Sequence, residues 1–152
     1  MDLGAKGSCQ IGGNAATSAG GKYVIKHGSF RSHILGMEAV LPNGEVLDMR
    51  TEIHKDNTGY DLKNLMIGSE GTLGMITKLN IHCPKIDDDR KILVFKTDSY
   101  DKILDSLSVI KKLLGKQLFA MEWVDGLSYH LVRKNMGYEI MDMEEDEFLL
   151  FI

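Results

Sequence analysis

The chain has 152 residues, which suits one ordinary domain or two small ones. With 43% hydrophobic and 26% charged residues it has the composition of a globular protein, and its net charge of −4 argues against nucleic-acid binding. Cys9 and Cys83 lie far apart without a Cys or His at metal-ligand spacing, which argues against a zinc-finger type of site. The sequence also lacks the run of roughly 18 apolar residues that a membrane helix needs.

The first unusual segment is IGGNAATSAGG at residues 11–21, which has four glycines, three alanines and one large apolar residue. Such residues fill little of a core, but they let a ligand or another segment approach the main chain closely. The glycine spacing matches neither the dinucleotide fingerprint G-x-G-x-x-G nor the Walker loop. Two interpretations therefore stay open for this run alone, a tight turn into a closely packed helix and a backbone site for an anion.

A hairpin is predicted next along the chain. Residues 34–41 and 45–49 are apolar segments on either side of the Asn43-Gly44 pair. Because both of these residues tolerate a positive φ, the pair predicts a tight turn between two antiparallel strands.

A second glycine-rich run, GSEGTLG at residues 68–74, follows a predicted short helix at residues 59–67 and opens into a predicted strand at residues 75–83. Two such runs in one small domain predict that both line the same groove. An extended, phosphate-bearing cofactor explains them better than two unrelated turns.

The composition of the sequence changes after a predicted linker at residues 84–90, since 13 of the 16 glycines precede this linker. Beyond the linker, residues 91–96 and 117–124 predict strands. The chain ends on FLLFI at residues 148–152, which has the composition of a buried strand with nothing behind it. We expect the chain to be an interior fragment of a longer protein.

Two helices are predicted in this second part. Ser99 is a candidate cap for a helix with one apolar stripe that ends at Gly115, and Asp125 caps a further helix to about residue 135. The alternation of strand and helix predicts a small α+β sandwich. Trp123 is expected to pack in its core.

Together, the segments DLGAKGSCQIGGNAATSAGG, HGSFRSHILGMEAVLPNGEVLD and KDNTGYDLKNLMIGSEGTLGMIT resemble the FAD-binding (PCMH-type) domain of vanillyl-alcohol-oxidase-like flavoproteins. Within that superfamily they are most similar to the D-2-hydroxyacid dehydrogenases, and nearest to the D-2-hydroxyglutarate branch. The resemblance implies an α+β fold in which residues 1–85 form the C-terminal part of the FAD-binding domain. Residues 90–152 would begin a truncated, ferredoxin-like cap domain.

The resemblance also implies a set of FAD-binding residues. The first run would contact the flavin or its diphosphate, and the second would border the adenosine and ribityl parts through backbone atoms. The residues are Ser8, Gly12, Gly13, Asn14, Thr17, Ser18, Ala19 and Gly20, followed by Glu70, Gly71, Thr72, Leu73, Gly74, Met75 and Ile76. Ser18 stands where the family commonly has Asn, which leaves a side-chain contact there in question.

The implied activity of the full-length protein is oxidation of a D-2-hydroxyacid, with D-2-hydroxyglutarate as the first choice, by hydride transfer to flavin N5. A D-lactate or glycolate dehydrogenase is the alternative within the family, and a non-catalytic, partner-binding remnant is the alternative outside it. An α+β domain with no ligand is a third. The family's catalytic residues and its metal ion, zinc by resemblance, are expected outside this chain, which should be inactive alone.

The family passes its electrons to an electron-transfer flavoprotein or a quinone-linked acceptor, and its location in eukaryotes is mitochondrial, with a cytoplasmic location as the alternative. No nucleic-acid partner is expected. Among the remaining residues, Glu70 is expected to cap its turn by accepting backbone N–H bonds, and Cys9 to be a small apolar filler. His33, His54, His82 and His130 are expected at the surface or in turns.

Overall fold

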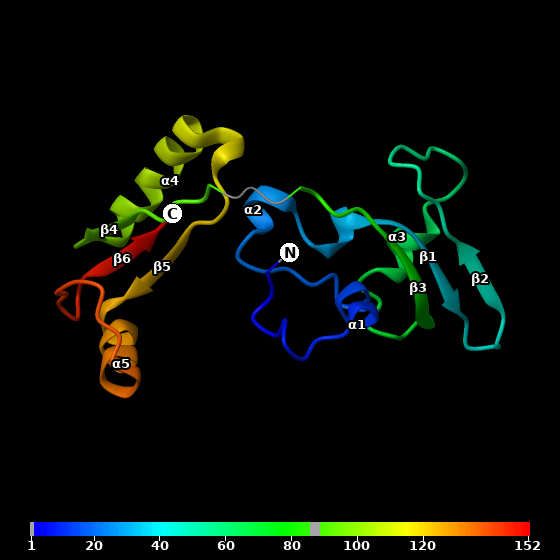
Figure 1. Cartoon of the computed structure of the whole chain (residues 1–152), viewed down its shortest axis with the longest axis horizontal. Coiled ribbons are helices and arrows are strands. Elements are labelled where there is room, and N and C mark those ends of the chain that lie inside the picture. Colours follow the sequence, from blue (N-terminus) through cyan, green and yellow to red (C-terminus); the bar gives the residue numbers. More distant parts are fainter. Residues whose placement is uncertain (1, 86–88) are drawn as a thin grey trace. The chain divides into compact units, whose positions relative to one another are not determined.

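The computed structural model describes residues 2–85 and 89–152, and the chain divides into two compact units, residues 1–86 and 87–152. Each unit combines a three-stranded antiparallel sheet with helices (Figure 1). The predicted α+β class is therefore confirmed. Within the described residues, no helix is both long enough and apolar enough to cross a membrane.

The sheet of the first unit has the strand order β2-β1-β3, with β1 at Ile34–Val40, β2 at Val46–Met49 and β3 at Met75–Ile81. The predicted hairpin is confirmed. Gly44 has a φ of 86°, and the amide of Leu41 donates to the carbonyl of Glu45 at 2.9 Å, which closes the turn between β1 and β2. The predicted strand that follows the second glycine run is β3.

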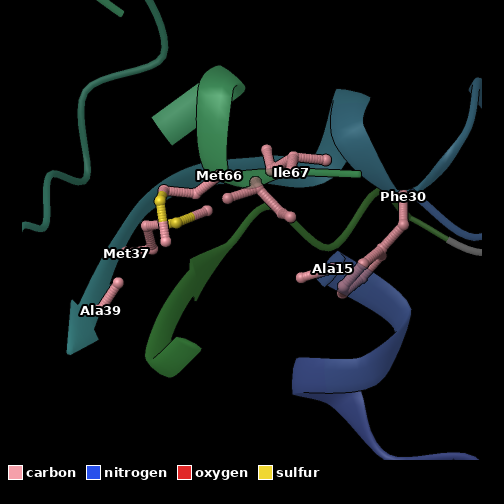
Figure 2. Close-up of a cluster of buried hydrophobic side chains, with 7 residues drawn as sticks. Ala15, Phe30, Met37, Ala39, Met66 and Ile67 are labelled. Atoms are coloured by element: carbon pink, nitrogen blue, oxygen red, sulfur yellow. The ribbon is translucent and has the colours of Figure 1, made fainter. Parts of the chain in front are cut away.

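The helices of the first unit are short: α1 at Ile11–Ala16, α2 at Val24–His27, the 3₁₀-helix η1 at Phe30–His33 and α3 at Leu62–Met66. Such short helices are stabilised by packing rather than by their own hydrogen bonds. Their apolar side chains and those of the central strand form one buried cluster, made up of Ala15, Phe30, Ile34, Met37, Ala39, Met66 and Ile67. Figure 2 shows Ala15 of α1 and Phe30 of η1 closing one end of this cluster, with Met37 of β1 against Met66 at the other. The core thus anchors α1 and α3, the two helices that precede or contain the glycine-rich runs.

The second unit has the strand order β4-β6-β5, with β4 at Val94–Thr97, β5 at Glu122–Asp125 and β6 at Phe148–Phe151. The C-terminal apolar segment is therefore the central strand, paired on both sides, and Leu149 is fully buried. The prediction that this segment is a buried strand is confirmed. It lies between β4 and β5 in the sheet although both precede it in the sequence.

The helices of the second unit are α4 at Tyr100–Leu114 and α5 at Gly126–Met136, with the 3₁₀-helix η2 at Gly115–Gln117 between α4 and β5. A pocket of about 330 Å³ separates α4 from the sheet and is lined mainly by apolar side chains, among them Phe95, Ile103 and Leu150. On the other face of the sheet, Tyr129 of α5 packs in a cluster with Leu149 and Met143.

The prediction that Trp123 packs in the core was wrong. Its side chain is 46% exposed and contacts Tyr100 and Phe148 edge-on, with ring centroids 5.3 and 5.8 Å away. Leu118 is the buried residue of the predicted strand, which begins only at Glu122. The alternation of side chains over residues 117–124 therefore predicted the wrong core residue, because the strand covers fewer residues than predicted.

The two predicted helix caps behave differently. The Asp125 carboxylate accepts a hydrogen bond from the amide of Ser128 at 2.8 Å, whereas the Ser99 side chain makes no cap bond with α4. We therefore expect Asp125→Ala to lower the free energy of unfolding by about 0.5–2 kcal/mol, and Ser99→Ala to change it by less than about 0.5 kcal/mol. Urea denaturation followed by circular dichroism measures both. Equal losses in the two variants would contradict the cap assignment.

Candidate functional site

The two glycine-rich runs are joined by main-chain hydrogen bonds. The amide of Gly68 donates to the carbonyl of Ala15 at 3.3 Å, and the amide of Glu70 donates to the carbonyl of Ala16 at 3.0 Å. Ala15 and Ala16 form the C-terminal end of α1, where helix carbonyls have no partner within the helix. Residues about 50 positions apart in the sequence therefore form one continuous backbone surface, as the groove hypothesis requires.

The first run is helical over its first half and turns sharply afterwards. The Thr17 hydroxyl donates to the carbonyl of Gly13 at 3.0 Å, and the amide of Ala19 donates to the carbonyl of Asn14 at 2.8 Å. Between them Ser18 has a φ of 50°, a left-handed conformation that Ser adopts with strain. The run is thus a helix that ends in a tight turn, as the first of the two interpretations predicted, and its geometry leaves the second interpretation open.

Several glycines of the runs are explained by packing inside the protein. A Cβ added at Gly12 would lie 3.4 Å from the carbonyl oxygen of Ile76, at the short end of ordinary van der Waals contact, so α1 packs against β3 at this residue. At Gly74 an added Cβ would lie only 2.5 Å from the carbonyl oxygen of Val40. Gly74 is therefore small because another backbone segment lies against it.

Gly13 has no such explanation. A Cβ added there would meet no atom within 4 Å, and the residue lies inside helix α1, where glycine costs about 1 kcal/mol relative to alanine. Gly71 also faces open space, but its φ of 81° requires glycine. Among the glycines of the two runs, Gly13 is therefore the one that neither a contact within 4 Å nor a positive φ in the described chain accounts for, and the space beside it is open. Gly4 and Gly7, in the turn before the first run, share these two properties.

The beginning of α1 suits an anionic group. The N-cap residue Gln10 makes no side-chain hydrogen bond to the helix, so the first amides of α1 lack the acceptor that a capping side chain supplies. Main-chain amides beside glycine are the groups that hold a phosphate in many nucleotide sites. The contact of this run with the diphosphate or flavin of FAD stays a prediction, which applies to the first turn of α1 and the open side of Gly13.

The lysines near this surface are neutralised by an acid of the chain. Asp2 pairs with Lys22 at 2.8 Å and with Lys6 at 2.9 Å, and its hydrogen bonds from Lys22 and then Lys6 lower its pKa to about 2. The backbone carbonyl of Asp2 lies against Gly21 so closely that a Cβ there could not be accommodated. Gly21 is thus another packing glycine.

The second run forms a turn with two unusual features. Glu70 has a φ of 50°, which is uncommon for a residue with a side chain, and the Ser69 hydroxyl is buried without a hydrogen-bond partner in the described part of the chain. The prediction that the Glu70 carboxylate caps the turn was wrong, because that carboxylate accepts no hydrogen bond from any described residue. Its amide makes the contact with α1, and the hydroxyl of Thr72 closes the turn by donating to the carbonyl of Ser69 at 2.6 Å.

The sequence interpretation missed Arg31, whose guanidinium lies behind this turn. Its Nη1 donates to the carbonyl of Asn64 at 2.8 Å, and its Nη2 donates to the carbonyl of Ile67 at 2.6 Å. The signal was present in the sequence, as a charged residue between the apolar positions of HGSFRSHIL. Its partners could be found only from the structure.

Not every residue predicted for the site is brought into this surface. Ser8 lies in the turn that precedes α1, where its amide donates to the carbonyl of Ala5 at 2.9 Å, and among the described residues it makes no hydrogen bond to the second run. Met75 is 71% exposed at the beginning of β3, and Leu73 lies in a bend two residues before it. Ile76 packs partly into the core of the first unit.

The expectation that His33 lies at the surface or in a turn was wrong, because its side chain is only 6% exposed and its Nε2 has no partner within the described residues. Burial lowers the pKa of the imidazole below its usual value. The rings of His54 and His82 contact each other edge-on, with centroids 4.6 Å apart. Across residues 2–85 and 89–152, no three His, Cys, Asp or Glu side chains are grouped to hold a metal ion.

Comparison with known proteins bears on the family and the cofactor. Residues 1–50 match the family described as FAD binding domain, which confirms the predicted resemblance and supports FAD as the cofactor. The chain is 44% identical over 150 residues to a mitochondrial D-2-hydroxyglutarate dehydrogenase of Bos taurus. It is 46% identical over 152 residues to a Schizosaccharomyces pombe protein provisionally named a mitochondrial D-lactate dehydrogenase.

These alignments include nearly the whole chain but a minor part of each relative. They cover 99% of this chain and 28% of the Bos taurus protein, and 100% of this chain and 29% of the Schizosaccharomyces pombe protein. Among solved structures, alkyldihydroxyacetonephosphate synthase aligns with a TM-score of 0.68 at 21% identity, over 93% of this chain and 27% of that one. At 21% identity this structural similarity shows the fold alone.

The strained φ of Ser18 predicts a stabilising substitution. Asn visits the left-handed region more readily than Ser, so Ser18→Asn should raise the free energy of unfolding by about 0.5 kcal/mol. Ser18→Ala serves as the control, since Ala meets the same backbone strain and should bring no gain. Urea denaturation of the three proteins measures the differences. A gain in the Ala variant as large as in the Asn variant would show that the hydroxyl, rather than φ, is responsible.

The buried His33 predicts a loss of stability at acidic pH. Because its pKa is lowered in the folded state, the unfolded chain, whose histidines titrate near pH 6.5, binds the proton more readily. The free energy of unfolding should therefore have its highest value above about pH 6.5 and should decrease as the pH falls below that value. His33→Leu should reduce this decrease, while His130→Leu, in the other unit, should preserve it. Denaturation curves measured between about pH 7.5 and 5 test this prediction. If the free energy of unfolding of the His33→Leu variant decreases as much as that of the unaltered chain, the effect does not come from His33.

Proposed function

We propose that this chain supplies one side of the FAD site of an oxidoreductase that oxidises a D-2-hydroxyacid. The observation that carries the proposal is Gly13, a helical glycine that faces open space in α1, the helix whose last carbonyls accept hydrogen bonds from the second glycine-rich run. The match of residues 1–50 to a FAD-binding family supports FAD as the ligand of that space.

The residues of this surface act by binding and positioning. The first-turn amides of α1 and the uncovered backbone at Gly13 would hold the diphosphate or flavin, and the turn at residues 68–71 would border the rest of the cofactor through main-chain atoms. Bound FAD supplies the acceptor for the hydride that leaves the substrate. The described residues bring no acid–base pair to this surface, so we place the groups that handle the substrate proton outside this chain.

The proposed substrate is D-2-hydroxyglutarate, which would be oxidised to 2-oxoglutarate. D-lactate or glycolate is the alternative, because relatives named for hydroxyglutarate and for lactate are similar to this chain at 44% and 46% identity. Electron transfer to an electron-transfer flavoprotein or a quinone-linked acceptor, and a mitochondrial location, belong to the same proposal. A cytoplasmic location is the alternative. Since the chain spans under a third of these relatives, we expect it to be inactive alone.

A non-catalytic, partner-binding role is the second candidate, and exposed apolar side chains of the second unit favour it. Leu113 of α4, Leu127 and Leu131 of α5 and Tyr138 are each more than half exposed. Of these, Leu127 and Leu131 lie four residues apart on one face of α5, and an exposed apolar helix face is typical of a surface that another chain or segment covers. Retention of flavin by the chain distinguishes the two candidates.

The proposal is tested by an absorbance scan of the purified chain, with and without added FAD, between about 350 and 500 nm. A flavin band that is shifted from that of free FAD and survives gel filtration is the expected result. A well-folded chain that retains no flavin contradicts binding by this chain.

Gly13 provides the sharper test. An added methyl group meets no protein atom, so Gly13→Ala should raise the free energy of unfolding by about 0.5–1 kcal/mol while it weakens FAD binding about tenfold or more. Gly7→Ala is the matched control, because Gly7 also faces open space but lies in the turn before α1. Thermal denaturation and flavin titration measure the two effects. A Gly13→Ala chain that is stabilised and binds FAD normally would remove Gly13 from the site.

A further inference from the structure

The side chain of Arg31 connects two elements that the cofactor surface needs. Arg31 lies on η1, and three hydrogen bonds tie its guanidinium to the end of α3: Nη1 donates to the carbonyl and to the Oδ1 of Asn64, at 2.8 and 3.1 Å, and Nη2 donates to the carbonyl of Ile67 at 2.6 Å. Carbonyls at the end of a helix have no partner within it, and a guanidinium satisfies them with a fixed fork of donors.

These bonds hold in place the residue that directly precedes the second glycine-rich run. Ile67 immediately precedes Gly68, whose amide donates to Ala15, and Glu70 donates to Ala16 two residues later. A Cβ added at Gly68 would lie 3.4 Å from Nη2 of Arg31, so the guanidinium packs directly against the turn. Because α3 has only five residues, its own hydrogen bonds fix its end weakly, and the arginine adds the missing constraint.

The acceptors of Arg31 are all uncharged. Within the described residues, no carboxylate lies at ion-pair distance from its guanidinium, so its role is not that of a surface salt bridge. Three acceptors on two residues require the planar fork of arginine, which a lysine ammonium cannot reproduce. These three hydrogen bonds therefore require the planar, forked shape of the arginine side chain as well as its charge.

We propose that Arg31 is a positioning residue for the cofactor, one that holds the turn at residues 68–71 against α1 so that both glycine runs present a single surface to FAD. This role rests on the proposed function, since a turn released from α1 would remove one border of the FAD site. The guanidinium acts through the carbonyls of Asn64 and Ile67 rather than on the substrate.

The positioning itself is tested without FAD, by amide hydrogen exchange of the apo chain. In Arg31→Lys and Arg31→Met, the amides of Gly68 and Glu70 should exchange at least about tenfold faster than in the unaltered chain, relative to the amide of His82. The His82 amide bonds to the carbonyl of His33 in the same unit and reports its general stability. Arg50→Lys, at the exposed ion pair with Asp48, is the matched control and should leave all three amides unchanged. Equal acceleration of all three amides in the Arg31 variants, or no acceleration, overturns the proposal.

The link to the cofactor is tested by flavin titration of the same variants. Arg31→Lys and Arg31→Met should both bind FAD about tenfold or more weakly, and guanidinium ion added well below denaturing concentrations should restore binding in Arg31→Ala where methylammonium at equal ionic strength does not. Normal FAD binding by a variant whose turn exchanges freely overturns the positioning role and leaves the proposed function standing. If the unaltered chain retains no FAD, the proposed function fails, and the exchange of Gly68 and Glu70 still decides what Arg31 holds in place.

Discussion

The first unit depends on two main-chain hydrogen bonds, those from the amides of Gly68 and Glu70 to the carbonyls of Ala15 and Ala16. They add partners to carbonyls at the end of α1, where the Ala15 carbonyl also accepts from the amide of Ser18, and they bring together two runs of small residues that are distant in the sequence. Glu70 adopts a strained φ of 50° while it makes one of them. A backbone arrangement of this kind persists only where neighbouring packing fixes it, and the buried cluster beneath α1 and α3 provides that packing.

Much of this architecture could be predicted from local sequence. The Asn43-Gly44 hairpin, the helix cap at Asp125 and the strand after the second glycine run each depend on a few adjacent residues, and all three are present. What could not be predicted depends on pairing across the sequence. The C-terminal FLLFI segment becomes the central strand of its sheet because β4 and β5 meet on either side of it, and no periodicity within the segment contains that information.

The candidate site shows the same division. Sequence alone indicated that two glycine-rich runs share a surface, and the hydrogen bonds between them agree with that inference. The contribution of Arg31 and the burial of His33 could not be predicted from the sequence, because each depends on which backbone carbonyls or side chains surround the residue in space. A polar residue between apolar ones is equally consistent with an exposed strand edge and with a buried hydrogen-bonding role, and only the fold separates the two.

Glycine content by itself is a weak indicator of a ligand, and this chain shows why. Gly21 and Gly74 are small because another main-chain segment lies against them, so a domain with no cofactor would also need glycine at these positions. Gly13 differs, since alanine would fit there and would favour the helix. Gly13 thus weakens its own helix, and no contact among the described residues compensates for it. The proposed function accounts for this cost by placing against Gly13 the FAD that the family match of residues 1–50 supports.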